Sequence, residues 1–499
     1  MQPPVAITIG GLGSTCMKYE PVIGLEVHAQ IHTASKMFCS CPVVQDTGDL
    51  EPNTYVCPVC TGMPGTLPVI NRRAVETTIL AGLALNCEIS PITTFARKNY
   101  FYPDLPKGYQ ISQLALPFAE NGWLEIETEA GRKRVGIENV HLEEDAGKLH
   151  HVDGASLVDL NRAGVPLIEI VSQPDMRSVG EARAYATGLH AILVYLGVNP
   201  GDMEKGSMRF EASVSVRPAG SDALNPRHEI KNLNSFRALA RAVEYEIVHQ
   251  IEVLESGGSV AQQTVGWNDD EGATYLQRSK EQAEDYRYFP EPDLPPLEVG
   301  RKWVAQLRAQ LVELPLAKRA RFIGDYGLND YDARLLVVDR ATADYYESAV
   351  TASGASASKT VANWITGELF RLMNENGQEI DAVRVSPQAL AELVGLVGDK
   401  TININTGKDV LAEMFASGRS ARQVVDERGL AQISDTAALE QIIARVLDEN
   451  PQQVGQYLDG RVQLIGWMMG QVMKATRGQA NPQVVRALLR ERLERMRDA

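Results

Sequence analysis

The sequence predicts a multidomain protein in which an α+β N-terminal domain precedes an all-α helical domain and an all-α C-terminal tail domain. Three observations predict this architecture. The chain has 499 residues, which at roughly 100–200 residues per domain suits two to four domains. Up to about Glu298, strand-like and helical segments are mixed, and beyond it nearly all signals are helical. Between these regions, prolines at 290–296 break both helices and strand ladders, because proline lacks an N–H group and restrains its predecessor.

The expected organisation is a leader followed by three domains. The second domain boundary depends on Gly398–Gly407, where a short polar run interrupts the helical pattern. Helices should begin where a capping residue precedes proline, at Ser386-Pro387, Asn450-Pro451 and Asn481-Pro482. The expected segments are residues 1–18 (leader), 19–295 (α+β domain), 296–400 (helical domain) and 401–499 (helical tail domain).

Composition excludes several classes of protein. Hydrophobic residues make up 44% and charged residues 23% of the chain, the ordinary mix of globular proteins and not that of disordered ones. The net charge of −15 disfavours wholesale coating of nucleic acid, so RNA contacts require local basic patches. No apolar run reaches the ~18 residues of a membrane span, and the leader lacks the charged region of a secretory signal and the arginines of a transit peptide. We expect a cytoplasmic enzyme without membrane contact.

The first strand pattern, Val22–Ile31, alternates apolar and polar residues. Because successive side chains of a strand point to opposite faces, Glu26, His28 and Gln30 share one face. On this segment alone, a solvated sheet face explains the alternation as well as a polar cleft does. The acidic segments that follow favour the cleft.

Two later segments add carboxylates. His141–Gly147 ends a strand-like stretch with three consecutive acids that include Glu143 and Glu144, and Pro166–Val171 holds Glu169 in an otherwise apolar run. A buried and unpaired glutamate is costly. We therefore expect Glu169 to coordinate a cation or meet a base, the alternative being a pair with a nearby arginine.

Two further segments place basic groups beside acids. Along Arg209–Arg217, Arg209, Glu211, two serines and the final arginine alternate onto one face, and Glu229 and Lys231 repeat the pattern. Hard oxygen ligands favour Mg²⁺, which bridges nucleotide phosphates, and basic partners neutralise the charge that develops in phosphoryl transfer. These faces suit phosphate and a divalent metal.

An amphipathic helix is expected over Ser235–Glu255. Its apolar residues follow one stripe, Ser235 supplies a capping side chain, and Gly257-Gly258 ends the pattern. The helix should pack on a sheet.

Four of the six cysteines crowd into a short segment. Cys39 and Cys41 form a C-x-C pair, and Cys57 and Cys60 form a C-x-x-C pair after 15 intervening residues. Four thiolates at this spacing predict one structural Zn²⁺ in a lobe over residues 38–63, the alternative being reduced cysteines in a loop. Four sulfur ligands leave no open position, which argues against a zinc hydrolase.

The chain carries five multi-residue blocks in order, Val22–His28, Arg97–Asp104, Leu142–Lys148, Lys231–Phe236 and Asp285–Asp293. Together they resemble the B subunits of the bacterial aspartyl/glutamyl-tRNA(Asn/Gln) amidotransferases. The resemblance runs from Tyr19 to the C-terminus, and Gly470–Gly478 is similar to part of that family's tail domain.

The resemblance implies a subunit of a ligase that forms C–N bonds with glutamine as amide donor. Such an enzyme converts Glu-tRNA(Gln) to Gln-tRNA(Gln), Asp-tRNA(Asn) to Asn-tRNA(Asn), or both. Ammonia cannot displace oxide from a carboxylate, so ATP and Mg²⁺ must first convert that carboxylate to an acyl phosphate. In the family, a cradle-shaped N-terminal domain holds this site, a glutaminase A subunit supplies ammonia, and a small C subunit completes the heterotrimer. The chain has no G-x-S-x-G or other recognisable glutaminase nucleophile motif.

Residue by residue, the resemblance also assigns roles. The catalytic positions are Glu26, His28, Glu143, Glu144, Glu169 and Glu229. The expected magnesium ligands among them are Glu26, His28, Glu144 and Glu169. Arg209 and Lys231 are expected to steady phosphate or the activated acyl group. Where the family often has Cys-Asp, this chain has Phe210-Glu211, which keeps the carboxylate but lengthens it by one methylene.

The C-terminal end reverses the overall charge. From Arg461 onward there are eight basic and three acidic residues. Val485, Leu489, Leu493 and Met496 form an apolar stripe, so the arginines between them should project to solvent, where they meet phosphate or merely water. The expected tRNA-binding residues are Lys474, Arg477, Arg486 and Arg490. The alternative function is a non-catalytic scaffold that binds tRNA.

Overall fold

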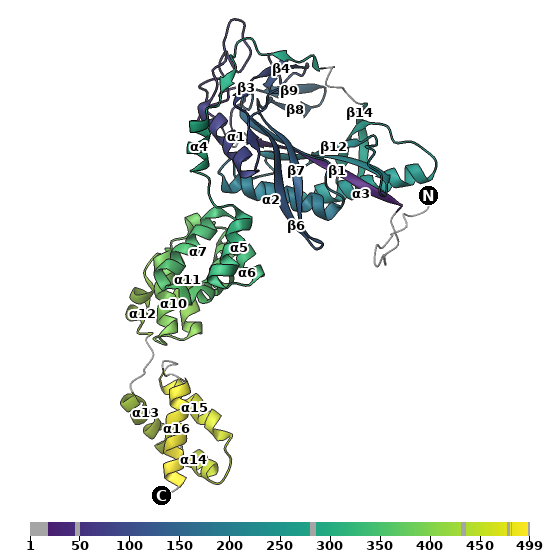
Figure 1. Ribbon diagram of the computed structural model, residues 1–499. Coiled ribbons are helices and arrows are strands. Elements are labelled where there is room, and N and C mark those ends of the chain that lie inside the picture. The colour runs from purple at the N-terminus through teal and green to yellow at the C-terminus, as the bar shows by residue number, and fades with distance from the viewer. Residues whose placement is uncertain are drawn as a thin grey trace. The chain divides into compact units, whose positions relative to one another are not determined.

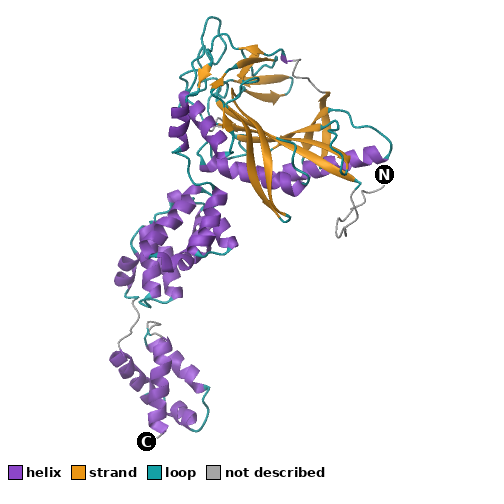
Figure 2. Ribbon diagram, viewed as in Figure 1, coloured by secondary structure: helices purple, strands orange, loops and turns teal. Residues whose placement is uncertain are grey.

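The computed structural model describes residues 18–44, 50–279, 286–430, 436–476, 480 and 482–497. It confirms the predicted class, with an α+β N-terminal region and a helical C-terminal region (Figures 1 and 2). The leader up to residue 17, with Cys16, and also Arg477 and Asn481 lie outside the described residues.

The chain forms two compact units, Met1–Leu314 and Pro315–Ala499. The division falls later than the boundary expected after residue 295. The reason is α4 (Arg301–Arg308), which places Leu307 in the core of the first unit and packs Trp303 against it. The prolines at 290–296 therefore lie within the first unit and do not separate it from the second.

A nine-stranded sheet dominates the described part of the first unit, in the order β14-β13-β12-β11-β1-β10-β7-β6-β2. Neighbouring strands are antiparallel except β12 and β13. Its strands are β1 (Tyr19–Gln30), β2 (Glu88–Ile89), β6 (Ala119–Thr128), β7 (Gly131–Glu144), β10 (Pro166–Ser172), β11 (Met208–Pro218), β12 (His228–Leu233), β13 (Gln263–Asn268) and β14 (Ala273–Ser279). The strand patterns read from the sequence at β1, β10 and β11 are confirmed.

Smaller sheets and helices complete this unit. The short strands are β3 (Ile92–Thr93), β4 (Ala96–Asn99), β5 (Tyr109–Ser112), β8 (Lys148–Val152), β9 (Ala155–Asp159), β15 (Phe289–Pro290) and β16 (Leu297–Glu298). Besides α4, the helices are α1 (Arg72–Ala84), α2 (Val179–Tyr195) and α3 (Phe236–Glu255). Figure 1 shows α2 and α3 running along one face of the large sheet, which they contact at β1, β6, β11 and β12.

The alternation of β1 decides which face these helices cover. Leu25, Val27 and Ala29 are buried and share one core with residues of α2 and α3. Glu26 and His28 consequently point to the opposite face. The helix expected over 235–255 is confirmed as α3, where the Ser235 hydroxyl accepts a hydrogen bond from the N–H of Ala238 at 3.0 Å.

The named elements of the second unit are all helices. Its elements are α5 (Pro315–Tyr326), α6 (Asp330–Leu336), α7 (Arg340–Ser353), η2 (Ala355–Ala357), α8 (Ser358–Asn363), η3 (Trp364–Leu369), α9 (Phe370–Asn376), η4 (Ile380–Ala382), α10 (Pro387–Gly398), α11 (Ile404–Ser417), α12 (Ala421–Arg428), α13 (Thr436–Asp448), α14 (Pro451–Leu458), α15 (Leu464–Ala475) and α16 (Pro482–Arg497). Ser386 caps α10 as expected. Helix α14 begins after Asn450, whose side chain instead donates to the carbonyl of Val446.

This unit contains two separate hydrophobic cores. One extends from Phe322 to Val425 and the other from Leu439 to Leu493. The boundary expected after residue 400 marks only the turn between α10 and α11, because Val410 and Leu411 of α11 belong to the same core as the residues of α10. The tail core therefore begins with α13.

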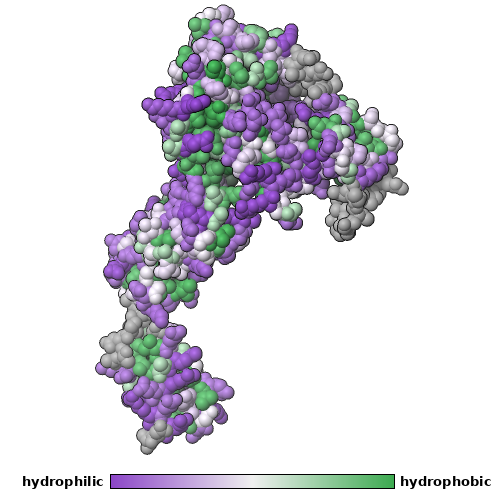
Figure 3. All heavy atoms as spheres, in the orientation of Figure 1, coloured by the Kyte–Doolittle hydropathy of each residue, from purple (hydrophilic) through white to green (hydrophobic). Residues whose placement is uncertain are grey.

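Hydropathy varies over the visible face of the structure. Figure 3 shows hydrophilic side chains over much of the visible face, interrupted by hydrophobic patches. Among the described residues, no helix combines the length and the apolarity that crossing a membrane requires.

Candidate functional site

Three neighbouring strands bring the expected acidic and basic residues onto the sheet face that α2 and α3 leave uncovered. In the register, His28 of β1 lies opposite Glu169 of β10 and Arg209 of β11, and Glu26 lies opposite Glu211. The Nε2 atom of His28 is 3.5 Å from Glu26 Oε1, 3.6 Å from Glu169 Oε2 and 3.8 Å from Glu143 Oε1. Three carboxylates, from β1, β7 and β10, thus meet around one imidazole.

The local charges shift the protonation of this cluster. Burial and the charge of Glu169 raise the pKa of Glu26 to about 8 and that of Glu143 to about 7. For His28, burial favours the neutral ring, but the hydrogen bond and charge of Glu169 prevail and raise its pKa to about 9. The same contact outweighs burial at Glu169 and lowers its pKa to about 2. The result is a largely buried His28–Glu169 ion pair beside two carboxyl groups that hold their protons unusually strongly, and a cation in the site would favour their ionised forms.

Three of these side chains lie close enough together that they could hold one metal ion. Glu26, His28 and Glu169 each offer a ligand atom, and these atoms lie within 4.8 Å of one another. Two carboxylate oxygens and one imidazole nitrogen suit a divalent cation, and the carboxylates suit Mg²⁺ in particular.

Consecutive residues of β7 have different surroundings. Glu143 joins the cluster and accepts a hydrogen bond from the Ser112 hydroxyl at 3.0 Å. Glu144 follows it in the strand and therefore points to the other face, where it accepts a hydrogen bond from the N–H of Ile111 at 2.9 Å and pairs with Lys107. The structure thus does not bring Glu144 to the other expected magnesium ligands.

The expected phosphate-binding residues lie beside the cluster. Lys231 Nζ is 2.6 Å from Glu211 Oε2 and 3.0 Å from Glu229 Oε1. Burial alone would lower the pKa of Lys231, but these two carboxylates raise it, so the ammonium stays charged. The longer side chain of Glu211 is directed to Lys231, and Glu229 is kept near the site by the same contact.

Arg209 is held by an acid that the sequence analysis did not assign. Its Nη2 atom lies 3.2 Å from Oδ1 of Asp145, a buried residue that also accepts a hydrogen bond from the Gln30 side chain at 2.8 Å. About a third of the Arg209 side chain remains exposed, at 36%. The guanidinium is thereby fixed in direction and still accessible to a ligand.

Two further residues of the site were missed. His141 Nδ1 is 4.0 Å from Glu169 Oε1, and the ammonium of Lys98 lies 4.9 Å from the ring centre of Tyr286. Burial lowers the pKa of Lys98, but nearby groups that include Glu143 and Glu169 outweigh it and raise that pKa. The period-two spacing of His141 before Glu143 was a usable signal, whereas nothing local in the sequence places Lys98 here.

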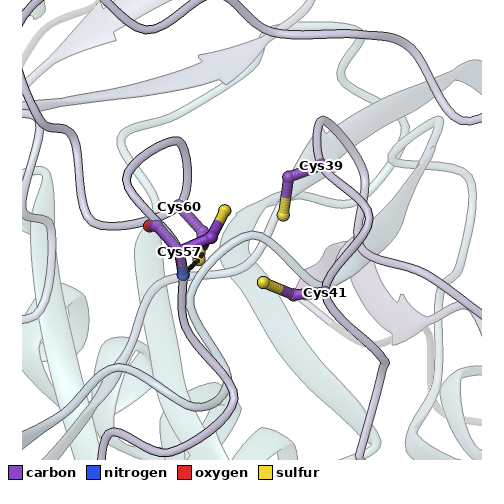
Figure 4. Close-up of side chains that lie close together, drawn as sticks. All are labelled: Cys39, Cys41, Cys57 and Cys60. Carbon is purple, nitrogen blue, oxygen red and sulfur yellow. Dashed lines mark hydrogen bonds between the residues drawn. The ribbon is translucent and has the colours of Figure 1, made fainter.

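The four cysteines of the 38–63 lobe converge from two loops (Figure 4). One sulfur from each of Cys39, Cys41, Cys57 and Cys60 lies within 4.8 Å of the others. The backbone N–H of Cys57 donates to the Cys60 sulfur at 3.2 Å, and a hydrogen bond with the Cys39 thiol is the main cause that lowers the pKa of Cys60 to about 4. Four converging sulfurs with a stabilised thiolate fit a tetrahedral structural metal site.

The structure describes three of the four basic residues expected to contact tRNA. Lys474 on α15 and both Arg486 and Arg490 on α16 are exposed, and Arg477 lies outside the described residues. Val485, Leu489 and Leu493 are fully buried in the tail core, while Met496 is 41% exposed. The buried apolar stripe of α16 thus ends at Leu493 and does not include Met496, and the exposed arginines of the helix face solvent.

Comparisons with known proteins cover nearly the whole chain. A family model described as "GatB/GatE catalytic domain" matches residues 21–305, and one described as "GatB domain" matches residues 344–493. Relatives named as B subunits of aspartyl/glutamyl-tRNA(Asn/Gln) amidotransferase include that of Moorella thermoacetica, 53% identical over 96% of this chain and 100% of the relative. That of Caldanaerobacter subterraneus subsp. tengcongensis is 51% identical over the same shares, and that of Myxococcus xanthus is 50% identical over 95% of this chain and 98% of the relative.

Proposed function

Since the chain belongs to the family of aspartyl/glutamyl-tRNA(Asn/Gln) amidotransferase B subunits, we propose that its N-terminal unit activates and amidates an amino acid carried by tRNA. The substrate is the side-chain carboxylate of Glu-tRNA(Gln), Asp-tRNA(Asn) or both. ATP phosphorylates this carboxylate, and ammonia then displaces the phosphate to give the amide. The overall reaction is that of a ligase with glutamine as amide donor.

The observation that carries this proposal is the convergence of Glu26, His28, Glu143 and Glu169 on one sheet face beside Arg209. Phosphoryl transfer to a carboxylate brings several negative oxygens together, so it needs a cation and fixed basic groups. The sheet face supplies both kinds of site, with acids for the cation and basic side chains for phosphate.

We assign the Mg²⁺ ligands to Glu26, His28 and Glu169, whose ligand atoms lie within 4.8 Å of one another. Bound Mg²⁺ would neutralise charge on the transferred phosphoryl group. Glu144 is not among the proposed ligands, because its carboxylate is taken by Lys107 and the N–H of Ile111.

The remaining polar residues take the other steps. Arg209 and Lys231 bind the phosphate of the activated carboxylate and stabilise it as it leaves. Glu143 is oriented by the Ser112 hydroxyl and lies outside the proposed ligand set, so its carboxylate accepts the proton that ammonia loses during attack. Glu229 holds Lys231 in position.

The rest of the chain serves assembly and substrate binding. The four-cysteine cluster holds one structural Zn²⁺, which fixes the 38–63 lobe. A glutaminase A subunit supplies ammonia, and a small C subunit joins the two in a heterotrimer that acts in the cytoplasm.

Lys474, Arg486 and Arg490 of the tail bind the phosphate backbone of tRNA, with Arg477 proposed from its sequence position alone.

An ATPase assay tests this proposal against the scaffold alternative. The purified chain is assembled with its A and C partners and supplied with ATP, Mg²⁺ and Glu-tRNA(Gln), with uncharged tRNA as the control. We expect ATP consumption that depends on the misacylated tRNA and on Mg²⁺. ATP consumption that is absent, or equal with uncharged tRNA, would indicate a scaffold.

A further inference from the structure

Lys36 is a buried lysine that the proposed chemistry leaves without a role. Only 1% of the residue is exposed. Its ammonium lies 3.7 Å from the sulfur of Cys60 and 3.4 Å from the carbonyl oxygen of Leu160, and no carboxylate of the described residues forms an ion pair with it. Burial of a charged group is costly unless an opposite charge is close. Among the contacts that this ammonium makes with described residues, the sulfur of Cys60 is the one that can carry a negative charge.

The charge of a four-cysteine zinc site matches this requirement. Four thiolates around one Zn²⁺ leave two negative charges uncompensated. The Cys60 sulfur also accepts the N–H of Cys57, and a buried ammonium adds a second donor with a full positive charge. Hydrogen bonds to ligating sulfurs are known to tune the stability of metal sites.

The backbone of Lys36 connects it to the other cysteine pair. Its N–H donates to the carbonyl of Cys41 at 2.9 Å, while its side chain extends to Cys60 of the second pair. The next residue, Met37, donates its N–H to the carbonyl of Gly164 at 2.7 Å. Lys36 therefore joins the two cysteine loops to each other and lies where the lobe meets the rest of the unit.

We propose that Lys36 is a positioning residue of the metal site, whose ammonium donates a hydrogen bond to the metal-bound Cys60 thiolate and offsets part of the site's negative charge. The inference depends on the proposed structural zinc and extends it to a residue outside the ligand set. It follows that the packing of Lys36 and the binding of the metal stabilise each other.

The test compares Lys36→Met, which keeps the length of the side chain but removes its charge, with Lys36→Arg and the wild type. Lys302→Met, at an exposed position of α4, is the matched control. Zinc is titrated away from the assembled complex with a chromogenic chelator. We expect the apparent zinc affinity of Lys36→Met to fall about 10–100-fold, that of Lys36→Arg to fall less, and that of the control to stay unchanged.

A spectroscopic readout separates this role from a merely structural one. In Co²⁺-loaded protein, loss of the hydrogen bond should shift the sulfur-to-metal charge-transfer band of Lys36→Met, whereas the control band stays in place. If Lys36→Met does not fold, Lys36→Gln gives the same comparison, because it is also neutral.

Failure of the proposed zinc site and failure of the proposed role of Lys36 would give different results. A wild-type protein without stoichiometric zinc would contradict the proposed zinc site itself, and this inference with it. A zinc-loaded wild type whose affinity and cobalt spectrum are matched by Lys36→Met or Lys36→Gln would overturn only the role of Lys36.

Discussion

Replacing Glu246 by alanine tests how the core of the N-terminal unit supports the site. Glu246 on α3 has no exposed surface and accepts hydrogen bonds from His228 Nδ1 at 2.7 Å, Thr274 Oγ1 at 2.6 Å and Gln250 Nε2 at 3.2 Å. His228 is the first residue of β12, directly before Glu229. The substitution therefore removes the partner of three donors beneath a strand that carries site residues.

The expected loss of stability follows from these contacts. A buried donor that loses its acceptor costs about 1–3 kcal/mol, so the loss of an acceptor shared by three donors should cost about 3–5 kcal/mol in all. For a unit of about 300 residues, an unfolding entropy of about 2.1 cal/mol/K per residue converts each kcal/mol into about 1.6 °C. The melting temperature of this unit should fall by about 5–8 °C at pH 7.

The effect should depend on pH in a defined direction. Burial opposes ionisation of Glu246, but hydrogen bonds from His228 and Thr274 prevail and hold its pKa below the ordinary value of 4.5. A carboxyl group with a lowered pKa stabilises the fold above its ordinary pKa, and this contribution is lost as the pH falls through the folded-state value. The difference in melting temperature between wild type and Glu246→Ala should thus be complete above pH 4.5 and shrink below it.

Scanning calorimetry of the full chain measures this difference, with the transition of the N-terminal unit followed separately. Glu252→Ala, an exposed position on the same helix, is the control and should cost no more than about 0.5 kcal/mol. If Glu246→Ala melts within about 1 °C of the wild type at pH 7, the buried pair does not support the strand and the reasoning fails.

Three further predictions follow from the same structure. Cys57→Ser should lose stoichiometric zinc and destabilise the 38–63 lobe more than it lowers amidation activity, because a closed metal site contributes folding energy. Unchanged zinc content and unchanged stability would refute this. Lys231→Met should lower kcat of transamidation about 100-fold, with partial recovery in Lys231→Arg, and a kcat near wild type would exclude Lys231 from phosphate binding. Deleting residues 436–499 should weaken tRNA binding and flatten its salt dependence, because phosphate contacts release counterions; a truncated chain with the affinity and the salt slope of the full chain would show that the tail does not bind tRNA.

The structure changes where this deletion should begin. The sequence places the tail domain from residue 401, where a polar run interrupts the helical pattern. That run is only a turn, because α11 returns its apolar face to the core of the preceding helices. A deletion that began there would expose this core, whereas one that begins at α13 removes a core of its own.

The period-two pattern of strands explains what could be predicted of the site. Alternation along β1 placed Glu26 and His28 on one face from the sequence alone, and the register then added Glu169 and Arg209. Adjacent residues of a strand point to opposite faces. Glu144 directly follows Glu143, so it does not reach the face where it was expected to bind magnesium. Family resemblance transfers residue identities and not the direction in which each side chain points.

Other parts of the site depend on contacts that no local pattern encodes. Lys98 reaches the acidic cluster from β4, a strand of a different sheet, and Asp145 holds Arg209 across a sequence separation of 64 residues. Lys36 looks like any surface lysine in the sequence, and only its 1% exposure and the position of Cys60 single it out. Long-range pairing decides these roles, so they become visible only in the folded chain.

The central claim, that the acidic sheet face of this chain performs the amidation, is tested most directly by Glu169→Gln in the complex assembled with the proposed A and C partners. The substitution keeps the size of a side chain that lies 3.6 Å from His28 but removes its charge. We predict that conversion of Glu-tRNA(Gln) falls at least about 100-fold while the glutaminase activity of the A subunit, measured without tRNA, persists and Glu252→Gln remains active. Amidation by Glu169→Gln at a rate near that of the wild type would contradict the claim.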